Sequence, residues 1–280
     1  MKKIVVAFDS FKGSLGSVEA AEAFISGFRE VCPDTESHIV AISDGGEGMA
    51  EAVVYALGGD MVAAKTHDPL NREITASYGV IDEGATAVIS MASASGLTLL
   101  RSEERNPLIT TTYGTGELLL DAVARGCRRI IVGLGGSATN DGGVGMLRAL
   151  GYKFFDTNGV ELVATIDILE CVESIIAPKV NPFQDIELSV AVDVNNPLCG
   201  ERGASMVYGA QKGATMDTFE KIVCLIKNNI VLENSIELKR EVDFVEVKKK
   251  EIIHTGSNRS RKDHVHGIPC GESGWRRIGG

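Results

Sequence analysis

The chain has 280 residues, of which 44% are hydrophobic and 24% charged, and its formal net charge at pH 7 is −10. It is a globular composition, long enough for two domains. The negative charge and an aromatic content of 5% argue against a nucleic-acid partner, because phosphates are repelled and bases find few rings to stack on. No segment is apolar for long enough to span a membrane, and the six cysteines lack metal-ligand spacing. We therefore expect a cytoplasmic protein with reduced thiols.

The first 60 residues alternate between strand and helix patterns. Residues 4–8 form a continuous apolar run, which predicts a buried strand. Residues 18–30 carry apolar side chains at helical spacing, and Ser17 is the expected N-cap. A second strand at 37–42 and a second helix at 49–57 follow. This alternation predicts a parallel α/β sheet.

The middle of the chain begins with two alternating segments, residues 72–80 and 85–91, which predict strands separated by a turn at 82–84. Further expected elements are a helix capped by Thr115 and ended by Gly126, a strand at 129–132, a helix at 146–150, a strand at 152–155, a turn at 157–159 and a strand at 186–194. Periodicity is lost from about residue 233. By composition we expect residues 233–280 to be partly disordered or displaced from a core.

One short segment occurs twice. Asp44-Gly45-Gly46-Glu47-Gly48-Met49 returns about a hundred residues later as Asp141-Gly142-Gly143-Val144-Gly145-Met146, and each copy leads into a helical pattern. Glycines at a helix start leave N–H groups uncovered, and these groups attract an anion. An aspartate there is unfavourable unless a cation, a hydroxyl or its own capping bond accompanies it. The repeat therefore predicts phosphate chemistry, with a carboxylate at work in each copy.

The loop at 133–143 is the richest candidate site, because it lies between a strand and a helix, where open α/β sheets bind ligands. Its candidate phosphate or substrate ligands are its glycines and polar side chains: Gly135, Gly136, Ser137, Thr139 and Asn140. The same loop contains Gly133-x-Gly135-x-x-Ala138, a loose dinucleotide fingerprint, so a nicotinamide-binding oxidoreductase stays an alternative. The alternative is a purely structural role, in which Asn140 or Asp141 caps the start of the helix.

Three other loops contain candidate functional residues. Lys12 lies in a glycine- and serine-containing turn after the first strand, where it could bind a phosphate or carboxylate. The alternative is a solvated surface lysine, and the sequence contains no Walker pattern. Asp193 leaves a buried strand into a polar loop, which suits a general base or a magnesium ligand, or an Asx-turn before Pro197. The hydroxyls of residues 110–115 favour a helix cap over a substrate site.

Six segments, in this order, closely resemble the type I glycerate kinases of bacteria: DSFKGSL at 9–15, SDGGEG at 43–48, TTYGTGE at 111–117, GGSATNDGG at 135–143, DVNNPL at 193–198 and GAQKGA at 209–214. That family phosphorylates glycerate with ATP and magnesium, commonly giving 2-phosphoglycerate. The resemblance implies an α/β fold of two α/β domains with the active site in the cleft between them, a parallel Rossmann-like first domain and a mixed-sheet domain inserted in it.

Matching the motifs residue by residue implies roles for these positions. Asp193, Asp44 and Lys12 are the expected catalytic residues: Lys12 and Mg²⁺ neutralise charge, and one of the two aspartates accepts the hydroxyl proton. The expected phosphate- or substrate-binding residues are Ser10, Gly13, Ser14, Gly45, Gly46, Gly135, Gly136, Ser137, Thr139 and Asn140. The expected magnesium ligands are Asp141 and Asp193. The partners implied are ATP and glycerate, with no nucleic acid and no membrane.

The resemblance also implies domain limits. We expect residues 1–65 in the first domain, 66–232 in the second, and a degenerate remnant at 233–280. After Gly213 and Ala214 the sequence departs from the family pattern, so we expect a truncated or aberrant C-terminal region. The alternative function is then a catalytically impaired remnant that only binds nucleotide or glycerate.

Overall fold

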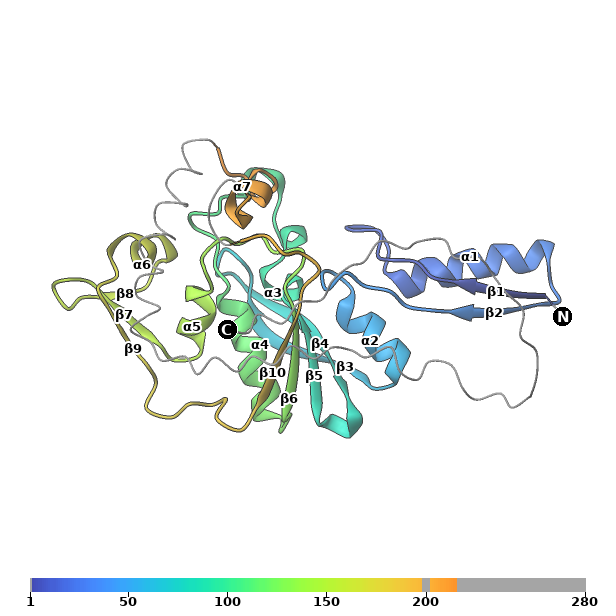
Figure 1. Cartoon of the computed structure of the whole chain (residues 1–280), viewed down its shortest axis with the longest axis horizontal. Coiled ribbons are helices and arrows are strands. Elements are labelled where there is room, and N and C mark those ends of the chain that lie inside the picture. The colour runs from blue at the N-terminus through green and yellow to red at the C-terminus, as the bar shows by residue number, and fades with distance from the viewer. Residues whose placement is uncertain (1, 198–201, 216–280) are drawn as a thin grey trace.

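The computed structural model describes residues 2–197 and 202–215 (Figure 1), so the remnant expected at 233–280 lies outside the described residues. The strands are β1 (Lys2–Val6), β2 (Thr35–Ile39), β3 (Asp60–His67), β4 (Glu73–Ile81), β5 (Thr86–Ser90), β6 (Arg129–Gly133), β7 (Lys153–Phe155), β8 (Glu161–Leu162), β9 (Ser174–Ile176) and β10 (Glu187–Ala191). The helices are α1 (Ser17–Val31), α2 (Met49–Leu57), α3 (Ala92–Ser95), α4 (Tyr113–Ala124), α5 (Val144–Ala149), α6 (Thr165–Cys171) and α7 (Ala204–Tyr208). The α/β fold class is confirmed. Within the described ranges, no helix has the length and apolar content needed to cross a bilayer.

The N-terminal part is a small parallel β-α-β unit. β1 and β2 pair in parallel, and α1 connects them. Val6, Ala21 and Ile25 are buried between helix and strands. Figure 1 shows these three elements extending to one side of the molecule, with α2 between them and the larger sheet. This unit matches the predicted parallel first domain.

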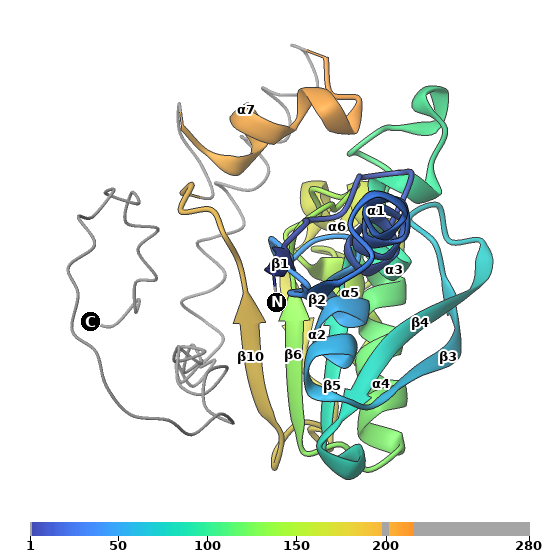
Figure 2. The same cartoon turned by 90° about the vertical axis from the view of Figure 1, so that its right-hand side faces the viewer.

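The larger sheet is mixed, as the second domain was expected to be. Its strand order is β10-β6-β5-β4-β3. β10, β6 and β5 run parallel, whereas β4 and β3 are antiparallel to their neighbours. Successive side chains of a strand point to opposite faces, so Ile89 packs in the cluster that contains Leu118 of α4, and Val88 packs against Met49 and Ala50 of α2. The two helices therefore cover opposite faces of the sheet (Figure 2).

A small antiparallel sheet of order β8-β7-β9 follows α5. Phe154 of β7 and Ile168 of α6 are fully buried there. The tight turn predicted at 157–159 is confirmed: the Asp156 N–H donates to the Val160 carbonyl at 3.0 Å, and Gly159 has a φ of 77°.

Two predicted helix caps are wrong. The N-cap of α1 is Gly16, which makes no side-chain cap bond, and Ser17 is the buried first residue of the helix. α4 begins at Tyr113, so Thr115 lies inside the helix. Its hydroxyl shares a 2.7 Å hydrogen bond with Ser95 of α3. Both hydroxyl residues were assigned to caps from local pattern, whereas tertiary packing determines their places.

The strand β3 was not predicted. Its buried side chains, Ala64 and Thr66, are small, so its alternation is weak in the sequence. β3 pairs with β4 along its whole length, from Asp60 to His67. The predicted domain boundary at residue 65 falls inside this strand, and the division into domains stays a prediction.

Candidate active site

The site lies where three parallel strands end. Ser90, Gly133 and Ala191 are register partners at the carboxyl ends of β5, β6 and β10, the edge at which α/β sheets bind ligands. The first glycine segment reaches this edge from outside the sheet. The Ser90 hydroxyl donates to the Gly46 carbonyl at 2.7 Å, and the Gly135 N–H donates to the Gly45 carbonyl at 3.1 Å. The two glycine segments therefore meet, backbone against backbone.

Glycine is required for this approach. A Cβ added to Gly133 would lie 2.2 Å from the Gly45 carbonyl oxygen, and one added to Gly135 would lie 2.7 Å from the Gly46 Cα. Both separations are shorter than any real Cβ contact, so either side chain would force the two segments apart.

The two copies of the repeat share one turn, but their helices begin at different positions. The N-cap of α2 is Gly48, the fifth residue of its copy, whereas the N-cap of α5 is Gly143, the third residue of its copy. Within each copy one aspartate oxygen accepts the N–H two residues later, from Gly46 to Asp44 at 2.9 Å and from Gly143 to Asp141 at 3.0 Å. The same local sequence thus produces the same turn twice.

In the first copy the other aspartate oxygen faces a cation. Asp44 Oδ2 accepts a 2.6 Å hydrogen bond from Lys12 Nζ, which lies on the loop between β1 and α1. Burial tends to raise the pKa of Asp44, but the bonds from Lys12 and from the Gly46 N–H together lower it below its ordinary value. The hydrogen bond from Lys12 to Asp44 raises the pKa of Lys12, as do the charges of Asp9 and Asp193. Lys12, Asp44 and Asp193 therefore share one electrostatic neighbourhood.

In the second copy the aspartate is enclosed by the fold. Asp141 is 1% exposed, and its Oδ2 accepts from the Thr112 N–H at 2.8 Å, the Thr112 hydroxyl at 2.8 Å and the Gly145 N–H at 3.2 Å. These bonds fix the start of α5 against the start of α4 and leave little capacity for a metal. Residues 2–197 and 202–215 contain no group of three or more His, Cys, Asp or Glu residues that could hold a metal ion.

A pocket of about 550 Å³ opens beside the Lys12–Asp44 pair. Its walls come from the loop at 10–16, from the first glycine segment and from the loop between α3 and α4: Ser10, Phe11, Lys12, Gly13, Ser14, Leu15, Gly16, Glu47, Gly48, Thr98, Leu100 and Arg105. Four of the residues predicted as ligands or catalysts, Ser10, Lys12, Gly13 and Ser14, thus line it. The Ser10 hydroxyl is buried, with no hydrogen-bond partner among the described residues.

The polar residues of the second loop are held by the segment around α7. Lys212, in the short turn η4 (Ala210–Lys212), donates from Nζ to the Ser137 hydroxyl at 3.0 Å and to the Thr139 carbonyl at 2.6 Å. Asn140 Nδ2 donates to the Ser205 hydroxyl of α7 at 2.9 Å. Burial lowers the pKa of Lys212 to about 8. Sequence reasoning assigned no role to Lys212, although its segment, GAQKGA, was one of the six motifs.

Several of the glycine N–H groups predicted to bind an anion are already hydrogen-bonded to other groups of the protein. The Gly45 N–H donates to the Ser43 hydroxyl at 3.2 Å, and the N–H groups of Gly46 and Gly135 are bonded as described above. These three glycines permit close approach and have no N–H group left to offer a ligand. Among the described residues no acceptor is found for the N–H groups of Glu47, Gly48 and Gly136, and an ideal Cβ on Gly136 would lie 3.7 Å from the Glu47 nitrogen.

The dinucleotide interpretation of residues 133–138 does not fit this geometry. A dinucleotide fingerprint opens directly into a helix, whereas here α5 begins only at Val144. The glycine turn instead pairs with the segment after α3, since the Leu97 N–H donates to the Gly136 carbonyl at 2.9 Å and the Ala138 N–H to the Ser95 carbonyl at 2.8 Å.

Comparison with known proteins gives consistent matches. The model of the glycerate kinase family matches residues 4–241. The chain is 46% identical over 223 residues to a glycerate kinase of Halalkalibacterium halodurans, covering 79% of this chain and 59% of that protein. It is 44% identical over 247 residues to the glycerate 2-kinase of Escherichia coli K12, covering 88% and 63%.

A solved structure agrees with these matches. A crystal structure of a protein described as a glycerate kinase 2 from Salmonella typhimurium LT2 has a TM-score of 0.71 and 42% identity, covering 82% of this chain and 62% of that chain. The chain thus spans about three fifths of the length of these relatives. The family match begins in β1 and continues beyond the last of the six motifs, and the chain therefore belongs to the glycerate kinase family.

Proposed function

We propose that this chain catalyses the ATP- and magnesium-dependent phosphorylation of glycerate, giving 2-phosphoglycerate. The observation that carries the proposal is the meeting of the two glycine segments, at 3.1 Å between the Gly135 nitrogen and the Gly45 oxygen, beside the Lys12–Asp44 pair. Phosphoryl transfer depends on placement and charge neutralisation more than on covalent catalysis. This edge of the sheet offers both, in a protein family whose named relatives are glycerate kinases.

Asp44 and Asp193, the two candidates for the general base, differ in whether their carboxylate oxygens are free to accept a proton. Both oxygens of Asp44 accept hydrogen bonds, from Lys12 and from the Gly46 N–H, so Asp44 is suited to orient Lys12. The carboxylate of Asp193 makes no hydrogen bond within residues 2–197 and 202–215, and its charge is felt by Lys12. Asp193 is therefore our choice as the base that accepts the hydroxyl proton of glycerate.

A magnesium ion needs carboxylate oxygens that are not already used inside the fold. Mg²⁺ on a nucleotide is held by one or two carboxylates together with phosphate oxygens and water. The oxygens of Asp141 are used inside the fold, and Asp193 is assigned as the base. We therefore assign Asp9, whose charge acts on Lys12 as that of Asp193 does, as the side chain that would hold the ion, which would neutralise charge on the transferred phosphoryl group.

The phosphates of ATP are assigned to the second glycine loop. Lys212 keeps one ammonium proton free after its bonds to Ser137 and Thr139, and the Gly136 N–H is unused within the described residues. Together they offer a positive charge and an amide donor to an oxyanion. Cytoplasmic location and action on small molecules alone, without nucleic acid, remain part of this proposal.

The test is a coupled assay of ADP release by the purified 280-residue chain with glycerate, ATP and Mg²⁺, with the phosphorylated carbon identified by ³¹P NMR. We expect ADP release that requires glycerate, and a 2-phospho product. Folded protein, verified by circular dichroism, that binds ATP without releasing ADP would instead support the impaired remnant. Affinity for NAD without affinity for ATP would overturn the proposal.

A further inference from the structure

The geometry points to Arg105 as the residue that binds the carboxylate of the hydroxy-acid acceptor, in the pocket between the loop at 10–16 and the loop at 98–105. This inference rests on the proposed function and specifies how its acceptor is recognised. It makes a free carboxylate, and not hydroxyl groups alone, the feature that defines the substrate class.

One side of the Arg105 guanidinium is unused. Nη1 donates to the Gln211 carbonyl at 3.5 Å. Nε, however, is buried with no hydrogen-bond partner among the described residues, and Nη2 makes no hydrogen bond there either. Nε–H and an Nη2–H form the parallel pair that binds a carboxylate in bidentate fashion. A buried, unused donor is costly, so a ligand with two coplanar oxygens is the natural partner.

Three other residues of this pocket complement a hydroxylated carboxylate. The pocket that Arg105 lines also contains Ser10, Ser14 and Glu47. The Ser10 hydroxyl, like Arg105 Nε, is buried with no partner in the described part of the chain. Two unpartnered polar atoms in one pocket therefore await the same ligand, and Glu47 offers an acceptor for a substrate hydroxyl.

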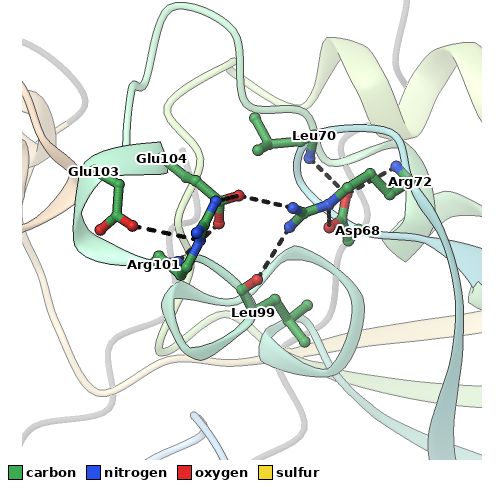
Figure 3. Close-up of polar contacts among 7 residues, drawn as sticks. All are labelled: Asp68, Leu70, Arg72, Leu99, Arg101, Glu103 and Glu104. Atoms are coloured by element: carbon green, nitrogen blue, oxygen red, sulfur yellow. Dashed lines mark hydrogen bonds and ion pairs between the residues drawn. The ribbon is translucent and has the colours of Figure 1, made fainter.

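The loop that carries Arg105 is fixed in advance (Figure 3). Glu104 accepts from Arg72 Nη1 at 2.9 Å and from Arg101 Nη2 at 3.1 Å. Arg72 also donates to the Leu99 carbonyl at 3.3 Å and is anchored on the buried Asp68. The bonds from Arg101, with the help of Arg72, lower the pKa of Glu104 to about 2, so this network stays ionised at neutral pH.

This network leaves Arg105 itself without an acidic partner. The two arginines beside it, Arg72 and Arg101, are the ones paired with Asp68, Glu103 and Glu104. Lys12 is neutralised by Asp44. Arg105 is thus the positive charge of the pocket that has no carboxylate partner among the described residues. One singly charged ligand balances it, whereas a triphosphate needs several cations, a role that the proposed function gives to Lys212 and magnesium.

The experiment compares Arg105→Lys and Arg105→Gln with the unmodified 280-residue chain. Binding of glycerate is measured by isothermal titration calorimetry without ATP, and KM for glycerate and for ATP by ADP release. Arg105→Gln removes a bidentate pair of charge-assisted hydrogen bonds, so we expect glycerate binding to weaken by ~100-fold or more, with KM for ATP unchanged within about twofold. Arg105→Lys keeps the charge without the fork and should recover only part of the loss.

Glycerol is the matched probe, since it keeps hydroxyls and lacks the carboxylate. The unmodified chain should prefer glycerate to glycerol, and Arg105→Gln should lose most of that preference. Arg125→Lys, at the far end of α4, is the control and should change neither affinity. A rise in KM for ATP in place of glycerate, or unchanged glycerate binding in both variants, would overturn the inference. Glycerate binding that depends on Arg105 without any turnover would uphold it while refuting the proposed function.

Discussion

If the chain binds ATP as proposed, the partly buried Lys212 makes that binding sensitive to pH. Its Nζ is held by Ser137 and Thr139, and burial lowers its pKa to about 8. In the free protein the ammonium is then about 90% protonated at pH 7 and about 10% at pH 9. A phosphate beside Nζ favours the charged form, so binding above pH 8 has to take up a proton. We expect KM for ATP to be flat below pH 8 and to rise by roughly tenfold per pH unit above it.

The assay is ADP release at saturating glycerate from pH 6.5 to 9.5, with three variants beside the unmodified chain. Lys212→Arg keeps its charge at every pH used, so its profile should be flat. Lys212→Met should also be flat, at the high KM that the unmodified chain approaches at pH 9.5. Lys153→Met, which removes only an exposed ion pair with Glu161, should keep the break near pH 8. The same break in Lys212→Arg, or none in the unmodified chain, would refute the reasoning.

Folding stability provides a second readout of Lys212 with an opposite sense. Below pH 8 both the folded and the unfolded chain hold the proton, so the full cost of burying the ammonium is present. Between pH 8 and the ordinary value of 10.5 the folded state has released the proton and the unfolded state keeps it, so the free energy of unfolding rises with pH. Relative to Lys212→Met, the unmodified chain should therefore gain stability over that interval in urea denaturation.

Three further predictions concern the aspartates and a tight glycine. Asp193→Asn should lower kcat by about 10²- to 10⁴-fold, with KM for ATP within about twofold, in the ADP-release assay; activity like that of the unmodified chain would remove Asp193 from the mechanism. Asp44→Asn should lower activity while costing at most about 1 kcal/mol of stability, because the ion pair it breaks is partly exposed. Asp141→Asn should cost about 2 kcal/mol or more, since a buried acceptor of N–H groups is replaced by a donor. Equal urea midpoints for the two variants would contradict this difference. Gly145→Ala should cost about 2 kcal/mol or more of stability, because its Cβ would lie 2.0 Å from the Thr111 hydroxyl oxygen. Gly27→Ala in α1, whose Cβ would meet no atom within 4 Å, should instead stabilise the fold by about 0.5–1 kcal/mol. Thermal melts of the two variants should therefore shift in opposite directions.

The local turns of the site could be predicted from the sequence, because their causes are local. Asp44 and Asp141 each accept the N–H two residues later, which is the ordinary behaviour of an aspartate before glycines. The glycines at both helix starts take positive φ, as their lack of Cβ allows. The placement of Lys12 and Asp44 in one cleft, by contrast, came from the family resemblance and not from a local rule.

The group that bonds to the second carboxylate oxygen of each aspartate could not be predicted. Asp44 Oδ2 meets Lys12, and Asp141 Oδ2 meets Thr112, although the two segments have almost the same sequence. What separates an active-site carboxylate from a structural one is a contact made by a distant segment. Lys212 and Arg105 were missed for the same reason, since each acts through residues that lie far from it in the sequence or through an unpaired atom that only packing reveals.

Apolar burial is what brings the first aspartate to the sheet edge. The loops after β6 and β10 leave adjacent parallel strands, so their proximity follows from the topology of the sheet. Asp44 precedes α2 and belongs to no strand of that sheet. It lies there because Met49 and Ala50 of α2 are buried against Ile81 and Val88, and burying such side chains stabilises by about 25 cal/mol per Å². A polar substitution at Met49 would therefore displace Asp44 without touching a polar atom of the site, so the proposed activity should depend on this core as well as on the charged residues.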